Sequence, residues 1–229
     1  MPLVGFAHIS LLIAIAAAAI LLSALCRRDR NLSRPVRLAL GFGLAANELI
    51  WWAFRYSHEG VHLANLPLQL CDVTVWITVW ACLKPSPLVV EFAYFAGLAG
   101  AGMALLTPDL WSPWPSYPAI YFFLAHGGVV IAVAVLAFGR VAPVGRHAPW
   151  RAFGLLLAYA AVIGGIDALL GANYMYLCRK PKNASLLDAF GPWPGYLLGG
   201  AAAALALFWL LWLPLASTAR MPPLDRGAA

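Results

Sequence analysis

The residues around Cys71 could make its thiol a nucleophile. The polar segment 69–72 places an amide and a carboxylate beside it, and the apolar run 73–83 follows at once. A cysteine becomes a nucleophile when a nearby base or cation favours its thiolate. Ionisable groups in a bilayer are costly and usually face the protein interior or a watery cavity. We therefore interpret this segment as a candidate active site, with packing of Cys71 as a small hydrophobic residue as the alternative.

His126 is the histidine that lies deep inside an apolar run, just before the glycines Gly127 and Gly128. A Cys–His pair requires one ring nitrogen near the sulfur and the other nitrogen held by an acceptor. Glu48 or Asp167 could be that acceptor. The alternative role for His126 is a hydrogen bond between helices.

Amide side chains near the same end of the expected helices could donate hydrogen bonds to an oxyanion. These candidates are Asn47, Asn65 and Gln69. Two of the carboxylates also have simpler alternative roles. Glu48 could pair with Arg55, and Asp72 could act as an acid at a helix N-terminus, where the helix dipole favours it.

A rim of polar residues is expected around this site and could bind the substrate. The rim residues are Arg55, His62, Asn173 and Tyr174, and the loop cations are Arg179, Lys180 and Lys182. The cations could clamp a lipid phosphate, or they could be a tolerated exception to the charge bias described below. The residues His58-Glu59-x-x-His62 have the spacing of the zinc-protease motif, so a metal site is an alternative. A protein nucleophile and a protein base need no metal, however, and we expect no metal and no cofactor. A disulfide between Cys71 and Cys178 is a further alternative.

The composition indicates a membrane protein. The chain has 229 residues, of which 63% are hydrophobic and 10% are charged. A soluble domain of this size would have too little polar surface. Runs of about twenty apolar residues indicate transmembrane helices. We expect one all-α domain, residues 1–229, made of seven transmembrane helices near 5–25, 36–56, 66–83, 86–106, 117–139, 149–171 and 194–217.

The positions of lysine and arginine predict the orientation. Basic residues fill the loops after the first, third and fifth expected helices, whereas the loop 107–118 has none. Because basic loops stay in the cytoplasm, we expect the N-terminus outside and the C-terminus in the cytoplasm. The polar residues then gather toward the outer leaflet. This bias also accounts for the net charge of +6 without a nucleic-acid partner.

Three stretches carry a family resemblance. They are 48–52, 62–72 with its Leu-Pro-Leu-Gln-Leu-Cys sequence, and 173–181 leading to Gly-Pro-Trp-Pro at 191–194. Together they resemble the YwaF-like bacterial integral membrane proteins, which are similar to the transmembrane protein 164 family of Cys/His phospholipid acyltransferases. The likeness runs from the first expected helix to the seventh.

The resemblance implies an intramembrane acyltransferase in the bacterial inner membrane, working toward the outer leaflet. Cys71 matches the nucleophile position and His126 the histidine position. Cys71 would take an acyl chain from a phospholipid as a thioester, and a lysophospholipid or water would then receive it. The expected partners are therefore phospholipids and lysophospholipids. The alternatives are a small-solute transporter or a non-catalytic lipid-binding protein, but a transporter needs polar residues at both faces.

Overall fold

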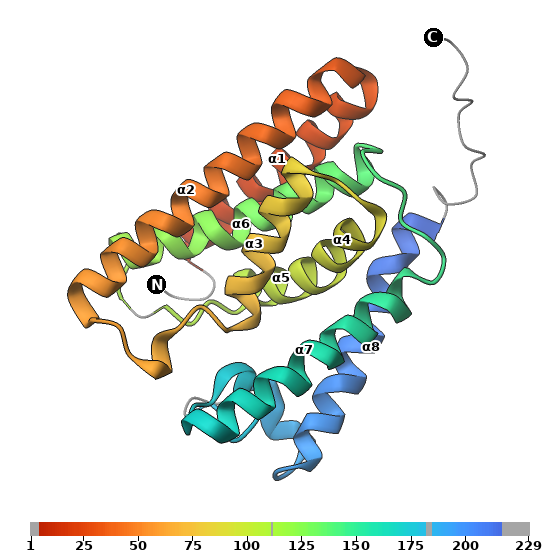
Figure 1. Cartoon of the computed structure of the whole chain (residues 1–229). Coiled ribbons are helices and arrows are strands. Elements are labelled where there is room, and N and C mark those ends of the chain that lie inside the picture. The colour runs from red at the N-terminus through yellow and green to blue at the C-terminus, as the bar shows by residue number, and fades with distance from the viewer. Residues whose placement is uncertain (1–4, 111, 182–184, 217–229) are drawn as a thin grey trace.

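A computed structural model describes residues 5–110, 112–181 and 185–216, and every regular element in these ranges is helical (Figure 1). The expectation of an all-α bundle of seven helices is confirmed, with the fourth helix formed by α4, η3 and α5 in succession. The long elements are α1 (Phe6–Arg28), α2 (Ser33–Glu59), α3 (Leu70–Leu83), α4 (Pro87–Phe92), η3 (Ala93–Gly97, a π-helical turn), α5 (Leu98–Leu106), α6 (Tyr117–Phe138), α7 (Ala148–Leu170) and α8 (Gly195–Ala216). The short 3-10 turns are η1 (Arg30–Leu32), η2 (Leu63–Asn65), η4 (Tyr174–Tyr176) and η5 (Leu186–Phe190).

The chain is a multi-pass integral membrane protein. Among the described residues, five helices are long and apolar enough to cross a membrane: α1, the combined helix 87–106, α6, α7 and α8. The sequence led us to expect seven such helices. The α2 helix is long enough, but its charged ends and the polar pair Asn47–Glu48 make it less apolar. The α3 helix has 14 residues and rises about 21 Å, which is less than the hydrocarbon core of about 30 Å.

The α3 helix begins at Leu70, four residues later than expected. Pro67 restricts the residue before it, and Leu66 has an extended backbone with φ −68° and ψ 155°. The carboxylate of Asp72 accepts a hydrogen bond of 3.2 Å from the backbone N–H of Gln69, which caps the new start. Cys71 therefore lies in the first helical turn, where backbone N–H groups have no partner within the helix.

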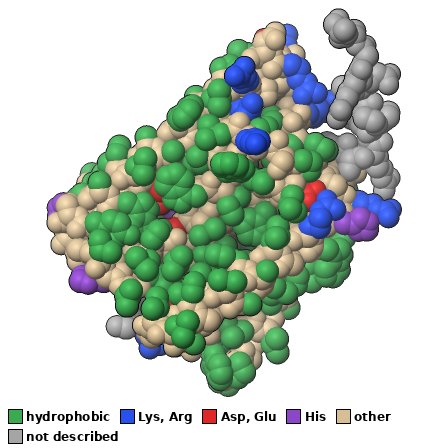
Figure 2. Space-filling model, viewed as in Figure 1, with side chains coloured by type: hydrophobic (Ala, Val, Ile, Leu, Met, Phe, Trp, Pro, Cys, Tyr) green, Lys and Arg blue, Asp and Glu red, His purple; other side chains and the backbone are tan. Residues whose placement is uncertain are grey.

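The α6 helix is the centre of the bundle and packs against α1, α2, α3 and α5. The α7 and α8 helices form an antiparallel pair that joins the rest through α4 and α5 (Figure 1). The face in Figure 2 is mostly apolar, and its Lys and Arg side chains gather toward the end where α1 meets α2 and α6 meets α7. This arrangement matches the charge asymmetry of the sequence, and the loop cations Arg179 and Lys180 at the opposite end are the exception to it.

An ion pair between a buried carboxylate and an exposed arginine fastens α7 to α4. The Glu91 side chain is 1% exposed, and it accepts a hydrogen bond of 2.8 Å from Nε of Arg151. The second carboxylate oxygen accepts from the backbone N–H of Gly145 at 3.0 Å and from the Arg151 guanidinium. One carboxylate thus satisfies donors from α7 and from the loop before it.

We expect Glu91→Gln to lower the free energy of unfolding by about 1 kcal/mol, because it removes the charged acceptor of three partly buried hydrogen bonds. Thermal unfolding in detergent measures the effect. Glu59→Gln is the matched control: Glu59 pairs with Arg55 at the surface, and such pairs contribute about 0.5 kcal/mol or less. Equal losses in the two variants would contradict a structural role for the Glu91 pair.

Candidate functional site

Tyr174 ties two distant loops together at the end of the bundle where α3 begins. Its hydroxyl donates to the carbonyl of Leu63 and accepts from the backbone N–H of Leu66 at 3.1 Å. Its backbone N–H donates to Oδ1 of the buried Asp167 at 2.8 Å. Tyr174 and Asp167, both named from the sequence, therefore position the loop that leads into α3.

Two further hydrogen bonds join the same segments. The hydroxyl of Tyr159 in α7 donates to the carbonyl of Leu68 at 2.8 Å. The side-chain carbonyl of Gln69 accepts from the backbone N–H of Met175 at 2.9 Å. The chain just before Cys71 is thus held from the α7 side at three successive points, and the first turn of α3 has a fixed place.

Cys71 lies in a recess rather than on an outer wall. Its side chain is exposed, and its electrostatic neighbours include Glu48 of α2, Tyr121 of α6 and Tyr159 of α7, so it lies between helices. The carboxylates of Asp72 and Glu48 are close enough to act electrostatically on the sulfur. Cys71 and Cys178 are both free thiols, so the alternative of a disulfide between them is excluded. The sulfur is accessible at a helix N-terminus, but the negative charges beside it disfavour the thiolate, so attack would require a base that takes the thiol proton.

Glu48 is fully buried and anchors the side of the recess formed by α2. It accepts hydrogen bonds from Nε1 of Trp52 at 2.8 Å and from the hydroxyl of Tyr121 at 2.9 Å. The alternative pairing with Arg55 is wrong, because Arg55 donates to Glu59 at 3.0 Å. The carboxylate links α2 to α6 and remains an electrostatic neighbour of Cys71.

His126 presents one ring nitrogen as an acceptor. Its Nδ1 lies 2.8 Å from the carbonyl of Phe122, so Nδ1 carries the hydrogen and Nε2 has the lone pair. Within the described chain, Nε2 has no hydrogen-bond partner. The acceptor that orients the ring is thus a backbone carbonyl, in place of Glu48 or Asp167.

Cys71 and His126, both among the described residues, form no hydrogen bond with each other: the charged neighbours of Cys71 are Asp72 and Glu48, whereas the His126 ring packs against Phe122. Their helices do approach the fourth helix at the same glycine. A Cβ on Gly97 would lie 3.1 Å from Val129 of α6 and 3.9 Å from Thr74 of α3, so both helices approach this glycine closely. Cys71 precedes Thr74 by three residues, and His126 precedes Val129 by three. Because residues three apart share a helix face, both side chains lie one turn beyond Gly97 toward the start of their helices.

Ala101 is the fourth-helix residue at this level. It lies four residues after Gly97, on the same helix face, and is buried. Its small side chain allows close packing of the neighbouring helices at this level.

We expect Ala101→Leu to lower any turnover at Cys71 by at least about tenfold, because the added carbons do not fit this buried position and must displace the neighbouring helices. The measurement is lipid turnover by purified protein in vesicles. Gly100→Leu is the matched control, because a Cβ at Gly100 meets nothing within 4 Å. Equal activity of the two variants would show that the packing at Ala101 does not position the site.

The remaining amide candidates have different surroundings. Asn65 donates to Gly60 and accepts from His62, and Asn173 likewise bonds within its own loop, so both shape loops. The Nδ2 of Asn47 is buried and has no hydrogen-bond partner among the described residues, as is also true of Oδ2 of Asp167. Asn47 therefore keeps a free donor, whereas Asn65 does not.

The rim holds the expected cations. Arg55 stacks over Trp52 and acts electrostatically on Asp72. His62 is exposed, and its ring bonds to the backbone beside it. Arg179 is exposed, and Lys182 lies outside the described residues.

Lys180 already has a partner. Its ammonium lies 3.3 Å from Oδ1 of Asp188 and sits over the ring of Tyr196. The backbone N–H of Ser185 and the Lys180 ammonium hold the pKa of the Asp188 carboxyl below its usual range. An anionic headgroup at Lys180 would therefore have to compete with Asp188.

Sequence reasoning missed Trp52, Tyr121 and Tyr159, which hold Glu48 and the α3 loop. Trp52 had one usable signal, since it lies four residues after Glu48 on the same helix face. The two tyrosines lie in apolar runs, where a phenol group also suits the membrane interface.

Comparison with known proteins gives one finding. The model of the TMEM164 family matches residues 3–212. Neither the search of curated proteins nor the search of solved structures returned a match.

Proposed function

Because the chain belongs to the TMEM164 family, which is linked to lipid acyltransferase activity, we propose that it moves an acyl chain from a phospholipid to a lysophospholipid. Transfer to water, which is ester hydrolysis, is the second outcome of the same chemistry. The observation that carries the proposal is the free Cys71 thiol in a recess at the N-terminus of α3. His126, which keeps a lone pair at Nε2, is the proposed base, and its ring must approach Cys71 for the steps below.

The first half-reaction transfers the acyl chain from the phospholipid to Cys71. Nε2 of His126 takes the thiol proton while Sγ of Cys71 attacks the ester carbonyl carbon. The tetrahedral intermediate collapses, the carbon–oxygen bond breaks, and His126 returns the proton to the leaving lysophospholipid oxygen. The product is an acyl thioester on Cys71.

The second half-reaction transfers the acyl chain from Cys71 to the acceptor. A lysophospholipid hydroxyl gives its proton to His126 and attacks the thioester carbonyl. The carbon–sulfur bond then breaks, and the proton moves to Cys71 as the new ester leaves. Both half-reactions use the same two protein groups, so no cofactor or metal enters the scheme.

Hydrogen-bond donors near the sulfur would stabilise the oxyanion. Backbone N–H groups in the first turn of α3 are free of helical partners. Gln69 uses its carbonyl oxygen on Met175, which leaves its amide NH₂ to donate. The unpartnered Nδ2 of Asn47 is a further candidate.

The proposed substrate enters from the outer leaflet of the bacterial inner membrane, with the N-terminus outside and all seven helices in the membrane. Arg55 and Arg179 would bind the headgroup phosphate, and Lys180 would join after leaving Asp188. The gathering of the basic residues at the other end of the bundle supports this orientation.

Detection of the acyl-enzyme tests the proposal. Purified protein in vesicles receives a phospholipid with an alkyne-tagged acyl chain, and tagged protein is then detected with and without hydroxylamine, which cleaves thioesters. We expect a hydroxylamine-sensitive adduct that maps to Cys71. Cys178→Ala is the control and should keep the adduct, because Cys178 is exposed in another loop. Lipid binding without any adduct would favour the non-catalytic alternative.

A further inference from the structure

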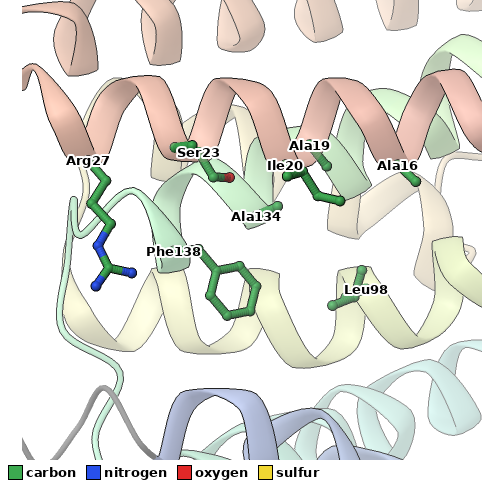
Figure 3. A pocket seen from close by; sticks show the side chains of 9 residues that line it. Ala16, Ala19, Ile20, Ser23, Arg27, Leu98, Ala134 and Phe138 are labelled. Atoms are coloured by element: carbon green, nitrogen blue, oxygen red, sulfur yellow. The ribbon is translucent and has the colours of Figure 1, made fainter.

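An apolar groove runs along α1, far from Cys71 in the sequence and on other elements. It has a volume of about 480 Å³, a size typical of small-molecule sites. Figure 3 shows Ala16, Ala19 and Ile20 of α1 above the groove, with Leu98 and Phe138 facing them from α5 and α6. Such a space between helices in a membrane is suited to a hydrocarbon chain.

Two polar groups of α1 also face the groove. The Ser23 side chain is 6% exposed, and its hydroxyl has no hydrogen-bond partner among the described residues. Figure 3 shows the Ser23 hydroxyl and the Arg27 side chain directed into the same space. Arg27 is exposed in the last turn of α1 and forms no ion pair within the described chain. A buried hydroxyl without a partner is costly. Because Ser23 lines this groove, an occupant with an acceptor would satisfy its hydroxyl.

The spacing of these groups fits one kind of occupant. Ser23 lies four residues before Arg27 and therefore about 6 Å deeper along the helix. The polar layer of each leaflet is about 5–8 Å thick, so this spacing matches the step from a lipid phosphate to the ester groups below it. Arginine binds phosphate through paired N–H donors, and basic pockets between membrane helices bind lipid headgroups.

We propose that this groove binds one phospholipid from the leaflet on the basic side of the bundle. Arg27 binds its phosphate, the Ser23 hydroxyl donates to an ester carbonyl, and one acyl chain lies between α1, α5 and α6. The site is separate from the recess at Cys71, so it does not depend on the proposed acyl transfer. The groove would hold one phospholipid in the leaflet opposite the proposed active site.

Photocrosslinking tests the proposal. The full-length protein is reconstituted in vesicles of phosphatidylglycerol and phosphatidylethanolamine with a small share of a phospholipid that carries a diazirine in one acyl chain. Adducts are mapped by mass spectrometry after irradiation. We expect adducts concentrated on residues 16–24 and on Phe138, and unchanged in Cys71→Ala.

Variants separate a built site from general lipid contact. Arg27→Gln removes the phosphate contact and should lower the adduct yield in the groove about tenfold. Ala19→Trp fills the groove and should abolish that yield, whereas Ala14→Trp, on an exposed face of α1, should not. An even spread of adducts around α1, or equal yields in the two tryptophan variants, would overturn the proposal. So would adducts between two copies of the chain in place of lipid adducts.

Discussion

Cys71→Ser is expected to lower acyl transfer by about 10³-fold or more. The substitution keeps a polar atom of similar size at the first turn of α3, so the recess and the loop contacts remain. It replaces a thiol by an alcohol, which ionises far less readily and forms an oxygen ester rather than a thioester. The hydroxylamine-sensitive adduct should vanish together with turnover.

The assay for this variant is the conversion of a labelled lysophospholipid to phospholipid in vesicles. Cys82→Ser is unsuitable as a control because Cys82 is buried in the core, whereas Cys178→Ser alters an exposed thiol and should leave turnover unchanged. Melting temperatures close to that of the unsubstituted chain exclude unfolding as the cause. Full turnover in Cys71→Ser would remove this residue as the nucleophile.

His126→Gln is expected to lower acyl transfer by about 10²- to 10⁴-fold, the usual contribution of a general base. Glutamine has a similar length, and its amide NH₂ can still donate to the carbonyl of Phe122. The variant therefore removes the basic Nε2 and little else. Loading of Cys71 and release of the acyl chain should slow together, because His126 serves both half-reactions.

Single-turnover loading and a pH profile distinguish a base from a packing group. In the unsubstituted chain, activity should rise with pH as His126 loses its proton, and this dependence should disappear in His126→Gln. His58→Gln is the control, because His58 is exposed at the end of α2. A variant that keeps the pH profile at reduced activity would assign His126 a structural role.

The sequence allowed us to predict the helical bundle but not every helix boundary. Apolar runs identify helices because a bilayer requires internally satisfied backbones. The segment 66–68 is apolar as well, and hydropathy alone therefore placed it in the third helix. Pro67 and the cap at Asp72 decide the boundary through backbone geometry, which hydropathy does not measure.

The sequence predicted which residues form the candidate site, but it did not predict which residues they contact. Cys71 and His126 stood out as ionisable groups in apolar runs, and the resemblance to a family supported them. Their shared level depends on the close approach of α3 and α6 to Gly97, a contact between segments far apart in the chain. The bond from Tyr121 to Glu48 likewise crosses from one helix to another, so no local pattern could reveal it.

The short α3 helix sets the depth in the membrane at which the acyl chain would be transferred. If its Lys84 end lies at one edge of the hydrocarbon core, a rise of about 21 Å leaves the first turn about 9 Å below the opposite edge. A lipid ester normally sits nearer the surface, so the donor must sink or the membrane must thin locally around this helix. Bulk solvent reaches that depth poorly. The thioester would then outlive encounters with water and await a second lipid, and thicker membranes should slow the exchange.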